Sequence, residues 1–134
     1  MKTVILLLLG IGVLTACKKA SKDDGRICTA EYRFYNIKVT GASGEAVTLD
    51  TFYTRVVASN ATFHANNVVP GAGNGYYTVV SDGQLLLLPE GKDTELRFTA
   101  IKNNKIVVNE SYIVKNNGCH IEEVSGKKEI VITQ

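Results

Sequence analysis

The chain has 134 residues, a formal net charge of +2, and basic and acidic residues interspersed along its length. No basic run gathers the positive charge, so the composition excludes a nucleic-acid partner from the working hypotheses. The length suits a single domain that is large enough to bury a hydrophobic core.

Residues 1–16 have the pattern of an export signal. A positive start at Lys2 precedes thirteen uncharged residues, Val4 to Ala16, in which Leu, Ile and Val dominate. A membrane-spanning helix needs about 20 apolar residues. This run is therefore too short for one and has the length of the apolar part of a signal peptide.

The leader ends in Leu14-Thr15-Ala16-Cys17, which resembles the bacterial lipobox. The resemblance implies cleavage after Ala16 and acylation of the Cys17 thiol, so that fatty acyl chains such as palmitate hold the protein on a membrane. Each buried CH₂ contributes about 0.8 kcal/mol to membrane affinity, and stable anchoring takes more than one chain. The alternative is an ordinary signal peptide that ends near a cysteine.

Residues 17–25 are predicted to be the lipidated cysteine and a solvated tether, because Lys18 to Gly25 contains no large apolar group. Its Lys22-Asp23-Asp24 cluster resembles the Lys-acidic-acidic export signal of Bacteroidota surface lipoproteins, where that signal tends to lie closer to the cysteine. Surface and periplasmic orientations both stay open. Residues 26–134 are then the folded domain.

Three cysteines are an odd number for an exported protein. Lipid on Cys17 leaves Cys28 and Cys119, which are 91 positions apart. In an oxidising compartment we predict that these two form a disulfide bond. A closed loop of that length stabilises by roughly 4–5 kcal/mol in the chain-entropy model. The alternative is a pair of buried free thiols.

The domain begins with strand patterns. Ala30, Tyr32 and Phe34 alternate with charged residues, and the apolar phase then slips to Ile37 and Val39. A slip of one residue predicts a β-bulge near Tyr35-Asn36.

Further strands are expected between turn residues. The segment 47–58 should turn Val47, Leu49 and Phe52 inward, and the segment 76–81 should form the next strand. Asp82-Gly83 reads as a hairpin turn leading to a strand over 85–88.

The second half continues this pattern. Leu96, Phe98 and Ala100 should face the core, and a turn at Asn103-Asn104 should return the chain as a partner strand over 106–114. Two short strands are expected at 119–124 and 129–132. No segment shows a sustained helical period, so no helix longer than a turn or two is expected. The fold class is therefore all-β, an antiparallel immunoglobulin-like β-sandwich of seven or eight strands.

The stretch from Ser59 to Gly75 is rich in Asn and Gly and is about 17 residues long. Long loops in compact domains are often functional, although this one has room for a short strand around 62–65. The alternative is a crossover between two sheets.

The whole chain resembles the small Bacteroidota lipoproteins that carry one immunoglobulin-like or transthyretin-like β-sandwich. The residues behind the resemblance are the lipobox with its charged tether, Gly75-Tyr76-Tyr77-Thr78-Val79, Gly118-Cys119-His120-Ile121 and Val124-Ser125-Gly126. It implies a lipid-anchored location on the outer membrane and a sandwich fold. It implies no reaction, because many such proteins lack an assigned function.

Catalytic, metal and cofactor sites are not expected. The two histidines, His64 and His120, show no metal-ligand spacing with each other or with Cys and acids. His120 should be a surface strand residue. The Gly71, Gly73 and Gly75 series precedes a strand, whereas a dinucleotide fingerprint follows one.

One pattern suggests a ligand. Adjacent Tyr76 and Tyr77 should point one outward and one inward, and the loop supplies three asparagines as candidate ligand-binding residues with them: Asn66, Asn67 and Asn74. Tyr35 and Tyr53 are candidates for further exposed rings. The alternative is that these tyrosines are half-buried sheet residues.

Three function hypotheses follow. The first is a non-enzymatic, lipid-anchored accessory or protein-interaction module that docks on another envelope protein through a sheet face or the 59–75 loop. The second is a surface glycan-binding module that uses the tyrosines and this loop. The third is a small hydrolase with a scattered site. It predicts a deep polar pocket where a histidine and an acid converge, and a shallow surface around both histidines would exclude it.

Overall fold

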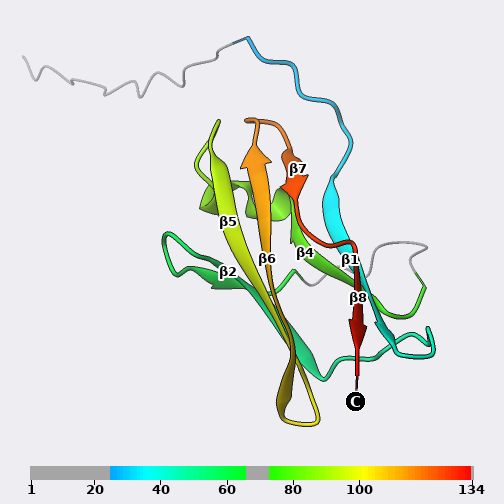
Figure 1. Cartoon of the computed structure of the whole chain (residues 1–134). Helices are drawn as coiled ribbons and strands as arrows, with labels where there is room; N and C mark the ends of the chain where they lie inside the picture. Colours follow the sequence, from blue (N-terminus) through cyan, green and yellow to red (C-terminus); the bar gives the residue numbers. More distant parts are fainter. Residues whose placement is uncertain (1–24, 66–72, 134) are drawn as a thin grey trace, which may run out of the picture.

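The structure is a computed structural model that describes residues 25–65 and 73–133. Two β-sheets pack against each other, so the predicted all-β sandwich is confirmed (Figure 1). One sheet has the strand order β4-β1-β8 and the other β3-β2-β5-β6-β7. The elements are β1 (Phe34–Gly41), β2 (Thr51–Val56), β3 (Thr62–Phe63), β4 (Tyr76–Ser81), the 3₁₀ helix η1 (Asp82–Leu87), β5 (Asp93–Lys102), β6 (Lys105–Asn116), β7 (Ile121–Ser125) and β8 (Glu129–Ile132).

The smaller sheet is centred on β1, which pairs antiparallel with β4 and parallel with β8. The parallel ladder departs from the fully antiparallel expectation. The predicted bulge is confirmed between Tyr35 and Asn36, and its extra residue is Val79 of β4. The strand alternation expected before the bulge, with Ala30 and Tyr32 on the apolar face, is wrong. Residues 25–33 lie outside the strands, and Tyr32 is 51% exposed. Tyr35, expected as an exposed ring, is instead buried.

The larger sheet follows the predicted pattern closely. Leu96, Phe98 and Ala100 of β5 are fully buried, and β5 pairs with β6 along its whole length. Asn103 and Asn104 join the two strands with φ of +50° and +59°. Both angles are positive, as a type I′ hairpin turn requires, and asparagine tolerates this region well. The short strand expected in the Asn-rich loop is present as β3.

The strand expected at 85–88 is wrong, because these residues belong to η1 and its C-cap. Asp82-Gly83 opens this helix and makes no hairpin, since β4 and β5 lie in different sheets. Gln84 accepts hydrogen bonds from the backbone and hydroxyl of Ser81 at 3.0 and 2.9 Å, which starts the helix. The Asn116 amide donates to the carbonyls of Leu85 and Leu88, so the crossover is held without a sheet partner.

The described part of the chain has no helix with the length and apolarity to cross a membrane.

The core fills the space between the two sheets. Val47 and Leu49 are buried as predicted, and Phe52 packs against the core from β2. The largest fully buried side chains come from both sheets: Tyr35, Tyr112, Phe98, Ile37 and Leu96.

Two core tyrosines differ in how their hydroxyl groups are satisfied. The Tyr77 hydroxyl accepts from Leu49 N at 2.8 Å and donates to Val47 O at 2.7 Å. The Tyr112 hydroxyl is buried and has no hydrogen-bond partner within the described residues. Burial is also the main cause that raises the pKa of Tyr112 far above its ordinary value, followed by the nearby Tyr35 and Glu110.

This difference predicts opposite effects for the same substitution. Tyr112→Phe removes an unsatisfied buried polar group and should raise the free energy of unfolding by about 1 kcal/mol. Tyr77→Phe leaves Leu49 N and Val47 O without their hydrogen-bond partner and should lower the free energy of unfolding by about 1–3 kcal/mol. Urea denaturation of the purified variants measures both. A loss of stability in Tyr112→Phe would contradict the unsatisfied hydroxyl.

Candidate functional site

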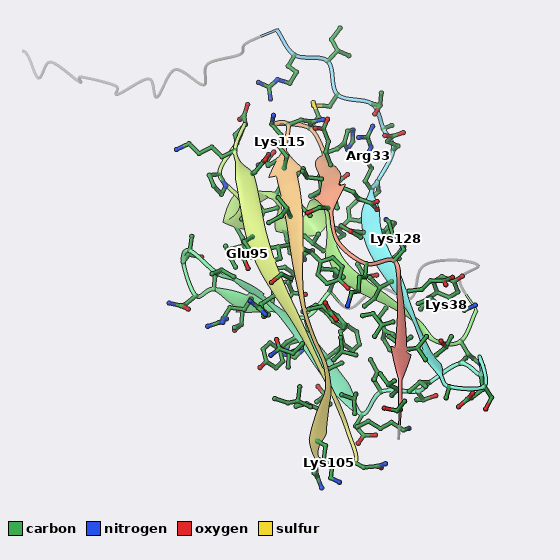
Figure 2. The ribbon with its side chains drawn as sticks, in the orientation of Figure 1. Arg33, Lys38, Glu95, Lys105, Lys115 and Lys128 are labelled. Atoms are coloured by element: carbon green, nitrogen blue, oxygen red, sulfur yellow. A yellow bond between two sulfur atoms is a disulfide. The ribbon has the colours of Figure 1, made fainter. Side chains whose placement is uncertain are left out.

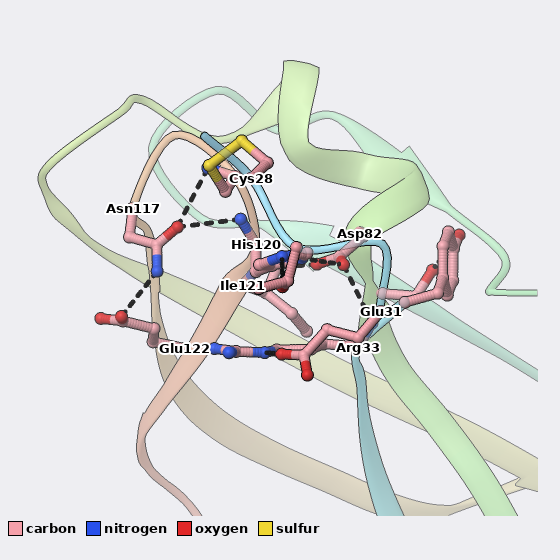
Figure 3. Close-up of polar contacts among 12 residues, drawn as sticks. Cys28, Glu31, Arg33, Asp82, Asn117, His120, Ile121 and Glu122 are labelled. Carbon is pink, nitrogen blue, oxygen red and sulfur yellow. Dashed lines mark hydrogen bonds and ion pairs between the residues drawn. A yellow bond between two sulfur atoms is a disulfide. The ribbon is translucent and has the colours of Figure 1, made fainter. Parts of the chain in front are cut away.

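The predicted cysteine pair is present as a disulfide bond, with 5.4 Å between the Cα atoms of Cys28 and Cys119. It joins the segment before β1 to the loop before β7. Figure 3 shows that a polar cluster lies beside it, formed by Asp82, His120 and Asn117. The side chains of Asp82 and His120 are only 8% and 7% exposed. His120 is therefore a buried residue, and its predicted surface position is wrong.

Asp82 organises this cluster by accepting three hydrogen bonds. Its carboxylate receives Arg33 N at 2.9 Å, Ile121 N at 2.8 Å and His120 Nδ1 at 2.7 Å. Asp82 N in turn donates to Arg33 O at 3.0 Å. One side chain therefore connects the start of η1 with the segments that enter β1 and β7, and we call this set the Asp82 clamp.

Two opposing effects act on the pKa of Asp82. Burial acts to raise it, but hydrogen bonds from Arg33 N, the His120 ring and Ile121 N, together with the charge interaction with His120, bring it below the ordinary value of 3.8. The carboxylate is thus the form that the fold stabilises.

The clamp contains the histidine and acid that the hydrolase hypothesis requires. His120 Nδ1 faces the Asp82 carboxylate, and His120 Nε2 lies 2.9 Å from the Thr29 hydroxyl. This is the hydrogen-bond order of a hydroxyl–His–Asp relay. Two backbone donors of the adjoining turn, Cys119 N and His120 N, donate to Asn117 Oδ1 at 3.0 and 2.9 Å. These two N–H groups are therefore not available to stabilise an oxyanion.

The structure does not bring Tyr76 and Tyr77 together as one ligand-binding surface, because their side chains point in different directions. Tyr76 is 44% exposed, with Lys38 Nζ 6.0 Å from its ring centroid, while the Tyr77 hydroxyl points inward to the Val47 backbone. Asn74 is exposed near the start of β4. Asn66 and Asn67 lie outside the described residues, as does Cys17.

A different groove lies on the outer face of the larger sheet. It has a volume of about 430 Å³, within the usual range of small-molecule sites. We call it the arginine groove, and its lining residues come from β2, β3, β5 and β6: Tyr53, Arg55, Thr62, Arg97, Thr99, Ile106 and Asn109.

A second groove of about 450 Å³ lies between the β5–β6 hairpin and β8. Ile106 and Val131 expose 62% and 63% of their surface there. We call it the hairpin groove, and its lining residues are Lys102, Asn103, Lys105, Ile106, Val107, Val131, Ile132 and Thr133. Ile106 lines both grooves, so the two are neighbours.

No group of three or more His, Cys, Asp and Glu side chains among the described residues is arranged to hold a metal ion. His64, the other histidine, is exposed and donates through Nδ1 to Phe52 O at 2.7 Å.

Sequence reasoning missed Asp82, Arg55 and Arg97. Asp82 looked like a turn residue because its partners are 38 to 49 positions away. The alternation along β2 and β5 already indicated that both arginines face outward, but their juxtaposition depends on strand pairing.

No protein-family model, curated protein or solved structure matches this chain.

The Asp82 clamp predicts a specific pH dependence of stability. Because the pKa of Asp82 is lower in the folded state, its contribution is fully present above the unfolded value near 3.8 and disappears as the pH falls through the lower folded value. Asp82→Asn should therefore cost about 2–4 kcal/mol of unfolding free energy at pH 7, and the deficit should shrink below pH 3.8. Urea denaturation across this pH range measures the difference.

Asp93→Asn is the matched control, since Asp93 is exposed at the start of β5. It should change stability by less than about 0.5 kcal/mol. An Asp82→Asn deficit that stayed constant through the acid range would show that the carboxylate charge does not contribute.

Proposed function

We propose that this chain is a lipid-anchored protein of the bacterial outer membrane that works as a non-enzymatic accessory module. The lipobox ending at Cys17 and the resemblance to small Bacteroidota lipoproteins support the location. The clamp supports the non-enzymatic role, because it uses His120, Asp82 and Thr29 to join chain segments. In this proposal the domain acts by binding another envelope protein.

The hairpin groove is the observation that carries this proposal. Figure 1 shows that the described chain enters at the disulfide end, whereas the β5–β6 turn and the end of β8 lie at the opposite end. Figure 2 shows Lys105 at this far end and Lys115 near the disulfide end. A module tethered through its N-terminus would thus present the hairpin groove away from its anchor.

The chemistry of the groove indicates what kind of protein surface it would bind. Ile106 and Val131 are more than half exposed, and apolar surface rimmed by polar residues is typical of interaction sites. Lys102 and Lys105 form no ion pair with any described residue, and Lys102 Nζ donates to Thr48 O at 2.9 Å. We therefore infer a partner with an apolar contact bordered by carboxylates.

The lipid anchor is tested by Cys17→Ser. Without the thiol no acyl chain can be attached, so the variant should move from the washed membrane fraction to the soluble fraction and should lose labelling by fatty acid. Ser21→Ala in the tether is the control and should stay in the membrane. Retention of the Cys17→Ser protein at the wild-type level would contradict lipid anchoring at this position.

The interaction surface is tested by the Ile106→Asp/Val131→Asp double variant. Mild cross-linking in the native host, followed by purification of the tagged lipoprotein from membranes, should recover a stoichiometric envelope partner with wild type. The variant should recover at least tenfold less, since two buried, unpaired charges oppose docking.

Val124→Asp is the control, because Val124 is 49% exposed on β7 and lies outside both grooves. Equal recovery with the double variant would eliminate the hairpin groove as the contact surface. Repeated recovery of the protein alone from wild-type membranes would argue against the accessory role itself.

Glycan binding is a second candidate function, and the arginine groove favours it. Tyr53 supplies an outward ring there, and Asn109, Thr62 and Thr99 supply amide and hydroxyl groups. This groove brings together more ligand-binding chemistry than the described members of the Tyr76, Tyr77 and Asn74 set.

A further inference from the structure

We propose that the arginine groove binds an acidic saccharide, with Arg55 and Arg97 receiving its carboxylate or sulfate and Tyr53 contacting the sugar ring. The proposal rests on the second candidate function, glycan binding, and names its ligand class.

Strand register places these side chains in two adjacent rows. Tyr53 of β2 is opposite Thr99 of β5, which is opposite Asn109 of β6. One step along β2 and β5 on the same face, Arg55 is opposite Arg97. The rows are two residues apart along each strand, so they lie on the same face of the sheet. This face is opposite to the one on which Leu96 and Phe98 are buried, so both rows point away from the core.

The Arg55–Arg97 pair is the unusual feature of this face. Like charges directly opposite each other in adjacent strands destabilise a sheet. Arg97 has one carboxylate nearby, Glu95, at 3.5 Å, and Glu95 also accepts from the Ser111 hydroxyl at 2.9 Å. Arg55 forms no ion pair with any residue in the described ranges, and its Nη1 instead donates to the Asn60 amide oxygen at 3.2 Å. Of the two guanidinium groups only that of Arg97 has a carboxylate beside it, and an external anion would neutralise the charge of Arg55.

The rest of the groove matches the neutral part of a sugar. The Tyr53 and His64 rings are arranged edge to face, with 6.5 Å between their centroids, and His64 donates a hydrogen bond to Phe52 O. Thr99 is 5% exposed and lines the groove, and its hydroxyl has no hydrogen bond within the described part of the chain. Asn109 is exposed beside it. These groups supply a flat apolar surface next to a hydroxyl and an amide that can pair with sugar hydroxyls.

The position of the groove favours side-chain recognition. Most of its lining comes from β2, β5 and β6, inner strands whose ladders already use the backbone groups, and it reaches the edge strand β3 only through Thr62. An extended peptide binds most readily at a free sheet edge, where backbone hydrogen bonds are available. A ligand over these inner strands would be recognised by side chains, and arginine forks match carboxylate and sulfate oxygens in pairs. These features together favour an acidic saccharide over a peptide.

The test uses the full-length lipoprotein in detergent micelles and isothermal titration calorimetry. Trigalacturonate and a sulfated heparin trisaccharide are the acidic probes, galactotriose is the neutral probe, and oligoglutamate is the acidic peptide probe. At least one acidic saccharide should bind, at least tenfold more tightly than galactotriose or oligoglutamate, and its affinity should fall as salt rises. Arg55→Gln, Arg97→Gln and Tyr53→Ala should each weaken it at least tenfold.

Two further variants separate recognition from folding. Arg55→Lys/Arg97→Lys keeps both charges but removes the planar forks, so it should still weaken binding several-fold. Arg33→Gln removes an arginine outside the groove and should bind as wild type does. Thermal denaturation of each variant shows whether the fold is retained.

The outcomes that would overturn the proposal are distinct. Equal binding of galactotriose would overturn the acidic preference and leave glycan binding in place. Oligoglutamate binding that equals or exceeds saccharide binding would point to an acidic protein partner. Binding to none of the saccharides would overturn glycan binding itself, without affecting the accessory role tested by cross-linking.

Discussion

The carboxylate of Asp82 is the interaction on which the arrangement of this domain depends. It joins the segment before β1, the crossover helix and the start of β7, and β1 and β7 belong to different sheets. A buried carboxylate is stable only when its oxygens are hydrogen-bonded, and here they accept from two backbone donors and one ring nitrogen. The Cys28–Cys119 disulfide adds a covalent link at the same end. Together they link the two sheets at this end of the sandwich, and the hairpin groove is the one of the two grooves whose lining comes from both sheets.

The two ends of the sandwich differ in how far their polar groups are satisfied internally. At the clamp end, the side chains of Asp82, His120 and Asn117 already form hydrogen bonds within the protein. Few of their donors and acceptors are therefore left to bind a ligand. On the outer sheet face Arg55 has a neutral partner, Asn60, but no ion pair among the described residues, and at the hairpin end Ile106 is 62% exposed. Groups that are satisfied inside the protein stabilise it, and those that are not are the better candidates for binding.

Local patterns predicted much of the fold. The strands 76–81 and 129–132 were predicted with the bounds that the structure has, and the Asn103-Asn104 turn follows from the tolerance of asparagine for positive φ. The segment 85–88 was predicted as a strand because a short apolar run does not distinguish strand from helix. Its real state depends on Ser81, Gln84 and Asn116, whose hydrogen bonds hold the crossover.

The sequence by itself determined the features that depend on neighbouring residues: the strand alternation, the turns, the all-β class and the pairing expected of the two remaining cysteines. The candidate sites were decided only by tertiary structure. Arg55 and Arg97 are 42 positions apart and meet only because β2 and β5 pair in one register. A shift of one residue would turn one of them toward the core. Likewise, His120 is buried only because the crossover brings Asp82 to it, and no local pattern contains that contact.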